Sequence, residues 1–148
     1  MERTADGGVE LRLRPEERAL LIGLTAELRT LLEGAAGDPS LRRLFPPAYE
    51  DEDEERAYRE LTGESLLDGR REALELLART ADRDRLSAEE ADAWLRALND
   101  LRLVLGTRLN VQEDTFLEDL SDDPRAHALA VYGYLSWLQE QLVEALSG

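Results

Sequence analysis

The chain has 148 residues, with 33 acidic and 18 basic side chains and a formal net charge of −15. Every basic residue is arginine, cysteine and lysine are absent, and His127 is the single histidine. This composition excludes lysine Schiff-base chemistry, thiol nucleophiles, disulfides and thiolate zinc sites within the sequence. One histidine also cannot build a multi-histidine metal site.

Length predicts one domain over residues 1–148, and the absence of cysteine fits a soluble protein of the cytoplasm. A chain of this size buries enough surface to fold without disulfides or a metal. No apolar run approaches the roughly 18 residues that a membrane helix needs, and the first residues lack the apolar core of a signal peptide. Because negative charge repels phosphate backbones, we expect no nucleic acid as partner. We also expect no membrane partner, and the charge favours basic protein surfaces or divalent cations.

The first half of the chain shows one clear helix followed by weaker signals. We expect residues 1–8 to be flexible, and residues 9–14 alternate with the period of a short strand. Pro15 begins a helix that carries a leucine stripe as far as Gly34. A short proline-bounded helix should follow near 38–46, and the six consecutive acids at 50–55 predict a mobile loop.

The second half predicts three further long helices. The first covers residues 64–79, and the second begins at a capping box formed by Ser87 and Glu90. This helix is apolar on nearly all sides up to Gly106, which is typical of a central, buried helix. Residues 108–112 would then pair with 9–14, and Asp123-Pro124 begins the last helix. The fold class is therefore an all-α, single-domain bundle of four long helices, with short extra helices and one candidate two-stranded β element.

Polar residues interrupt the central helix and form the first candidate site. Asn99 and Asp100 are costly to bury without partners. Arg96 lies one turn from both Asp92 and Asp100 and can bridge the two carboxylates, while Arg102 points elsewhere and could reach another helix. We favour a polar network that fixes helix register over a functional site, and both readings remain open.

Four carboxylates, Glu72, Glu75, Glu89 and Asp92, form the second candidate site. Each pair lies three residues apart on one helix face, so two facing helices could hold Mg²⁺. The pattern resembles that of MazG-like nucleotide pyrophosphohydrolases, although Arg71 stands where that family has a glutamate. Such spacings arise easily by chance in an acidic chain, so we expect no enzyme and no cofactor.

Exposed aromatic and basic residues form the candidate interface. Trp137 lies off the apolar stripe of the last helix, so either a second layer buries it, which we favour, or it is an exposed interface residue. Arg42 and Arg43 beside Tyr49 form a compact basic-aromatic patch, which we expect to neutralise the acidic run. His127 has no nucleophile context and should lie at the surface.

A family resemblance rests on three segments, DPSLRRLFP at 38–46, AWLRALNDLRLVLG at 93–106 and VYGYLSWLQE at 131–140. They resemble an uncharacterised actinobacterial family known only as a domain of unknown function, and the likeness runs from Val9 to Leu146. The resemblance implies a cytosolic, mostly helical protein whose gene often lies beside those of the ClpS protease adaptor and a JAMM-type metalloprotease. Some members of that family carry a transcriptional-regulator label. It supplies no catalytic residues.

Together these observations predict a non-enzymatic protein-interaction or regulatory module. A link to ClpS and the Clp protease would follow from the gene neighbourhood that the resemblance implies. Two alternatives stay open, a Mg²⁺-dependent nucleotide pyrophosphohydrolase and a transcriptional regulator, the latter disfavoured by the charge of −15. The partner and the homo-oligomeric state are not determined by the sequence.

Overall fold

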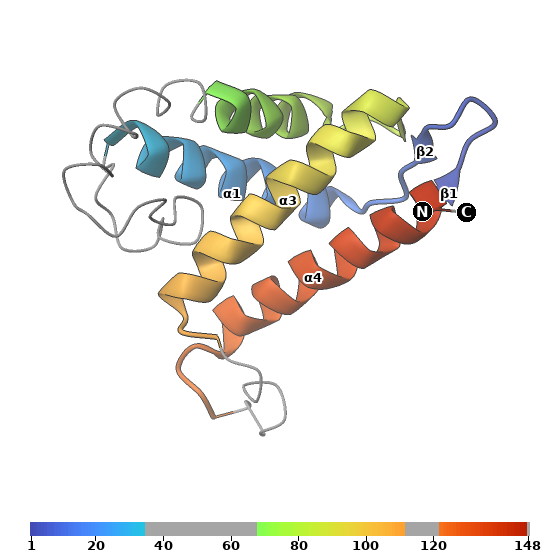
Figure 1. The fold of residues 1–148 in the computed structure, drawn as a ribbon. Coiled ribbons are helices and arrows are strands. Elements are labelled where there is room, and N and C mark those ends of the chain that lie inside the picture. Colours follow the sequence, from blue (N-terminus) through green and yellow to red (C-terminus); the bar gives the residue numbers. More distant parts are fainter. Residues whose placement is uncertain (35–67, 112–121, 148) are drawn as a thin grey trace, which may run out of the picture.

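The computed structural model describes residues 1–34, 68–111 and 122–147. Helices in these ranges are α1 (Pro15–Gly34), a helix over residues 68–80, α3 (Ala88–Arg108) and α4 (Ala126–Ser147). Figure 1 shows α3 crossing between the pair formed by α1 and the 68–80 helix and, on its other side, α4. The predicted bundle of four helices is confirmed, whereas the short helices expected near 38–46 lie outside the described residues.

The central helix α3 follows from its own sequence. Ser87 Oγ accepts a hydrogen bond from the Glu90 backbone N–H at 3.1 Å, and the Glu90 carboxylate accepts one from the Ser87 N–H at 2.9 Å. This reciprocal cap satisfies two backbone donors that the first helical turn would otherwise leave unpaired. Beyond it, Trp94 and Leu98 are fully buried, so the predictions of the capping box and of a central, buried helix are both confirmed.

The small β element has three strands, and its pairing corrects our prediction. Strand β2 (Val9–Glu10) lies between β1 (Glu2–Arg3) and β3 (Arg85–Leu86), antiparallel to both. The predicted partner, 108–112, is not a strand over its described residues, because α3 continues through Arg108. The backbone N–H groups of Leu109 and Val111 donate hydrogen bonds to carbonyls of α3, so they are not available to pair with a strand.

The N-terminal residues also differ from the expected flexible segment. Thr4 N–H donates to the carbonyl of Gly8 at 2.9 Å, and Gly7 N–H donates to the carbonyl of Thr4 at 3.1 Å. Gly7 has a φ of 88°, a conformation that a residue with a side chain rarely adopts. The turn returns the chain to β2, where Val9 is fully buried, so residues 1–8 are tied to the core.

The core lies where α1, the 68–80 helix, α3 and α4 meet. Trp94 Nε1–H donates to Thr80 Oγ1 at 2.7 Å, and the Thr80 hydroxyl donates to the Leu76 carbonyl at 2.6 Å. This chain of bonds fixes α3 against the 68–80 helix in a fully apolar setting. Among the described residues, no helix has both the length and the apolar character needed to cross a membrane.

Candidate interaction surface

Helix α4 has one buried face and one face directed away from the bundle. Its buried residues pack on α3, and its C-terminal end lies beside β1 and β2 (Figure 1). The inward stripe consists of Leu129, Leu135, Leu138, Leu142 and Ala145. On the other side, Trp137 is 50% exposed and Val143 is 45% exposed. Two large apolar side chains on one helix therefore remain outside the core.

Trp137 does not pack inside the molecule, contrary to the reading we favoured. Its ring contacts that of Tyr134, with centroids 6.0 Å apart and planes tilted by 33°. Tyr134 is itself half-buried, and burial together with the nearby Glu17 carboxylate raises the pKa of its hydroxyl, so it stays neutral at physiological pH. The tyrosine thus supports one side of the indole, and the rest of the ring faces solvent.

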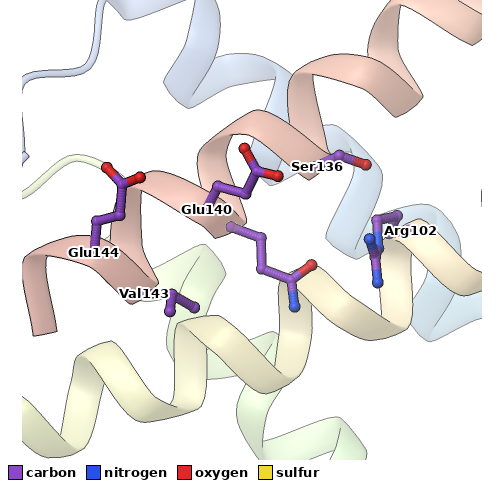
Figure 2. Close-up of a pocket in the computed structure, with 6 residues that line it drawn as sticks. Arg102, Ser136, Glu140, Val143 and Glu144 are labelled. Carbon is purple, nitrogen blue, oxygen red and sulfur yellow. The ribbon is translucent and has the colours of Figure 1, made fainter. Parts of the chain in front are cut away.

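A hollow of about 540 Å³ lies between α3 and α4, on the flank of the same helix. It is lined by Arg102, Ser136, Gln139, Glu140, Val143 and Glu144. Figure 2 shows Arg102 on α3 near Ser136 at one end of the hollow, with Glu140 and then Glu144 farther along α4. We refer to this hollow as the α3–α4 groove.

Two polar atoms of groove residues are buried and have no hydrogen-bond partner among the residues that the structure describes. They are Nε of Arg102 and Oε1 of Gln139. Arg102 does use its Nη2, which donates to Asn99 Oδ1 at 3.2 Å within α3. This hydrogen bond stays within α3, and the Arg102 side chain also lines the groove between α3 and α4.

The predicted polar cluster on α3 is divided into two separate ion pairs. Asp100, 5% exposed, accepts a hydrogen bond from Arg70 Nη1 of the 68–80 helix at 2.5 Å. Burial raises the pKa of Asp100, and Arg70 opposes that rise. Arg96 pairs with Asp92 at 3.5 Å, and both of these side chains are more than half exposed. The prediction that Arg96 bridges both carboxylates is therefore wrong for Asp100, whose ion pair comes from another helix.

These residues also border a second hollow, of about 340 Å³, lined by Gly69, Arg70, Ala73, Arg96, Asn99 and Asp100. Its most buried polar group, the Asp100 carboxylate, is already bonded to Arg70. The Arg70–Asp100 ion pair joins α3 to the 68–80 helix. This agrees with the prediction of a polar network that fixes how the helices pack.

The four carboxylates of the magnesium reading are not assembled into a site. Glu72, Glu75, Glu89 and Asp92 are all exposed, and Glu75 pairs with Arg29 of α1 at 3.2 Å. Within residues 1–34, 68–111 and 122–147, no group of three or more acidic or histidine side chains could hold a metal ion.

The remaining predicted residues either lie outside the described residues or are exposed and take no part in the groove. Arg42, Arg43, Tyr49 and the acidic run 50–55 lie outside the described residues. His127 is exposed, as expected. The sequence reasoning missed Val143 and Glu140 as surface residues of α4. A helical wheel centred on Trp137 places Glu140 beside it, whereas Arg70 has no local signal because its partner is 30 residues away.

Comparison with known proteins identifies the family. Residues 1–146 match the sequence family described as Domain of unknown function (DUF2017). Two similar curated proteins, from Mycobacterium tuberculosis (strain ATCC 25618 / H37Rv) and Mycobacterium bovis, bear the name "Oxidative stress regulator AosR". Each is 34% identical over 130 residues, covering 76% of this chain and 60% of the relative, so the chain spans under two thirds of the relatives' length.

No solved structure matches this chain. The mycobacterial relatives confirm the actinobacterial resemblance seen in the sequence. The match over nearly all residues shows that the chain belongs to the DUF2017 family.

Proposed function

We propose that this chain is a non-enzymatic regulatory module that binds another protein through α4. We define the α4 surface as Trp137, Glu140, Val143 and Glu144, together with Arg102 across the groove. The observation that carries the proposal is the half-exposed Trp137 beside a groove of about 540 Å³. Tryptophan is enriched at protein interfaces and among the residues that contribute most to binding energy.

The Tyr134 contact supports this role. An exposed aromatic side chain loses rotational freedom when a partner covers it, and that loss weakens binding. Tyr134 already supports Trp137 in the free protein, with ring centroids 6.0 Å apart. Part of the ordering is therefore complete before a partner arrives.

The regulatory part of the proposal is supported by the relatives, which are named as oxidative stress regulators. This chain has no cysteine, so thiol oxidation within these 148 residues cannot be the signal. We propose that the chain receives or passes on such a signal by contact with a protein that senses it.

A protein partner fits the charge distribution better than DNA. Arginines throughout the described residues pair with carboxylates of the chain, which leaves less positive charge for phosphates. They are Arg12, Arg14, Arg18, Arg29, Arg70, Arg71, Arg83, Arg96 and Arg125. The net charge of −15 acts in the same direction. The proposed regulator therefore acts on proteins, and the Clp adaptor ClpS is one candidate, on the family resemblance alone.

The test is quantitative co-purification from the native host with the wild type and Trp137→Ala. The matched control is Ile22→Ala, which removes another exposed apolar side chain, 42% exposed, from α1. We expect specific partners to be recovered at least about tenfold less with Trp137→Ala and unchanged with Ile22→Ala. Equal recovery by wild type and Trp137→Ala would refute the proposal. Absence of ClpS and Clp subunits from the Trp137-dependent set would remove the link to proteolysis.

A further inference from the structure

Five of the six side chains that line the α3–α4 groove are polar or charged, and the two glutamates outnumber the one arginine. Of its six lining residues, Val143 is apolar, Glu140 and Glu144 are acidic, and Arg102 is basic. Ligand cavities for small molecules are mostly apolar and enclosed, unlike this one. Its composition instead resembles the polar margin of a protein interface, with Trp137 and Val143 as the apolar part.

The acidic residues of the groove have no basic neighbour on their own helix. Helix α4 contains no arginine between Ala126 and Ser147. In the described residues, the ion pairs of the chain involve other carboxylates than Glu140 and Glu144. These two glutamates lie four residues apart on one helix face, where like charges repel. A cation placed between them would relieve that repulsion.

Two polar atoms of groove side chains lack a hydrogen-bond partner among the described residues. Arg102 Nε is a donor and Gln139 Oε1 is an acceptor, and neither has a hydrogen-bond partner. Buried polar atoms in native proteins are nearly always bonded. Both atoms are closed to solvent, so a bound segment reaches them only after the Arg102 and Gln139 side chains rotate toward the groove.

We infer that the groove binds a basic amphipathic segment of another protein, an inference that rests on the proposed function. An arginine or lysine of this segment pairs with Glu140 and Glu144, and an apolar residue packs on Trp137 and Val143. A second copy of this chain is a poor occupant because it would bring its own net charge of −15 and the same two glutamates. The partner is therefore a different, basic protein.

The probe is a synthetic helical peptide with leucines at i, i+3, i+4 and i+7 and arginines on its other face. Two matched peptides carry glutamates instead of the arginines, or serines instead of the leucines. Binding is followed by calorimetry and by Trp137 emission. Trp94 is fully buried, so its emission forms a constant background. We expect the arginine–leucine peptide alone to bind and to shift the Trp137 emission to the blue.

Variants of the protein test whether the peptide binds at the α4 surface. The double variant Glu140→Gln/Glu144→Gln should weaken binding about three- to tenfold, since exposed ion pairs contribute little each, and added salt should act in the same direction. Trp137→Ala should weaken binding about tenfold or more. The control Glu27→Gln/Glu33→Gln removes the same charge from exposed positions of α1 and should change binding less than about twofold.

Three results would overturn the inference: no binding of the arginine–leucine peptide, equal binding of the glutamate peptide, or equal weakening by the α1 control. A native partner lost with Trp137→Ala but retained by Glu140→Gln/Glu144→Gln would refute the basic chemistry and leave the proposed function standing. If the native partner is retained by Trp137→Ala, the proposed function itself fails.

Discussion

Replacing Asp100 with alanine should lower the free energy of unfolding by about 1–2 kcal/mol. Asp100 is 5% exposed and accepts a hydrogen bond from Arg70 Nη1 at 2.5 Å, so the substitution removes one charged partner of a largely buried guanidinium. Stranding a buried polar group costs about 1–3 kcal/mol, and breaking a fully buried ion pair costs about 3–5 kcal/mol.

Two features of the site explain why we expect a destabilisation by Asp100→Ala well below the cost of breaking a fully buried ion pair. The Arg70 side chain is 28% exposed, so water can replace part of the lost bond. Burial of the Asp100 carboxylate raises its pKa, and this desolvation cost disappears when the side chain is removed. Asp100→Asn keeps an acceptor for Arg70 without the charge, so it should destabilise by less than Asp100→Ala.

The free energy of unfolding of both variants is measured by urea denaturation, and their melting temperature by heating, each followed by circular dichroism. For a domain of this size the alanine variant should melt about 2–8 °C below the wild type. The matched control is Asp92→Ala on the same helix, where both side chains of the pair with Arg96 are more than half exposed. That change should stay within about 0.5 kcal/mol of the wild type. If Asp100→Ala were no more destabilising than Asp92→Ala, the assignment of Asp100 as a structural anchor would be refuted.

The same site predicts a pH dependence with a definite sign. The pKa of Asp100 is above its ordinary value of 3.8, mainly through burial, so the folded state binds the proton more readily than the unfolded chain. The stability from this group is therefore fully present below pH 3.8 and is lost as the pH rises through the folded-state pKa. The stability of the wild type relative to Asp100→Asn should fall over this window in urea titrations at stepped pH. If the stability of the wild type relative to Asp100→Asn increased with pH over this window, the predicted sign of the pH dependence would be refuted.

Three further substitutions separate the core from the surface. Thr80→Val removes the acceptor of the Trp94 indole N–H and should lower the free energy of unfolding by about 1–3 kcal/mol in urea denaturation; an unchanged midpoint would contradict the buried bond. Gly8→Ala would place a Cβ against the Leu86 carbonyl and should cost about 1–3 kcal/mol, with faster amide exchange in β2 and β3. Trp137→Ala should change stability by less than about 0.5 kcal/mol in thermal melts; a larger loss would show that the indole belongs to the core.

The sequence predicted the elements whose signals are local. Pro15 is the first residue of α1, and the Ser87–Glu90 capping box stands at the start of α3 as expected. These features depend on residues within one helical turn, so spacing alone identifies them. The one-sided apolar stripe of α4, including Leu135 and Leu142, follows from periodicity in the same way.

Long-range partners could not be predicted from spacing. Arg96 is nearer in sequence to Asp100 than Arg70 is, yet only the packing of the 68–80 helix decides which guanidinium reaches the buried carboxylate. Strand β3 has two residues, too few for an alternating pattern, and its position follows from pairing with β2. Trp137 was correctly placed off the apolar stripe, but a helical wheel does not show whether another element covers that side.

The placement of arginine connects stability to the proposed binding surface. Arg18, Arg29 and Arg70 bond between segments, from α1 to residues 81–84 and Glu75, and from the 68–80 helix to Asp100. These three arginines place positive charge at contacts among the first three described helices, whereas α4 contains no arginine that could pair with Glu140 or Glu144. The same arrangement that anchors the bundle leaves α4 acidic. Stability and binding should therefore respond to different substitutions: Asp100→Ala should melt earlier yet bind the arginine–leucine peptide at wild-type affinity below its melting temperature.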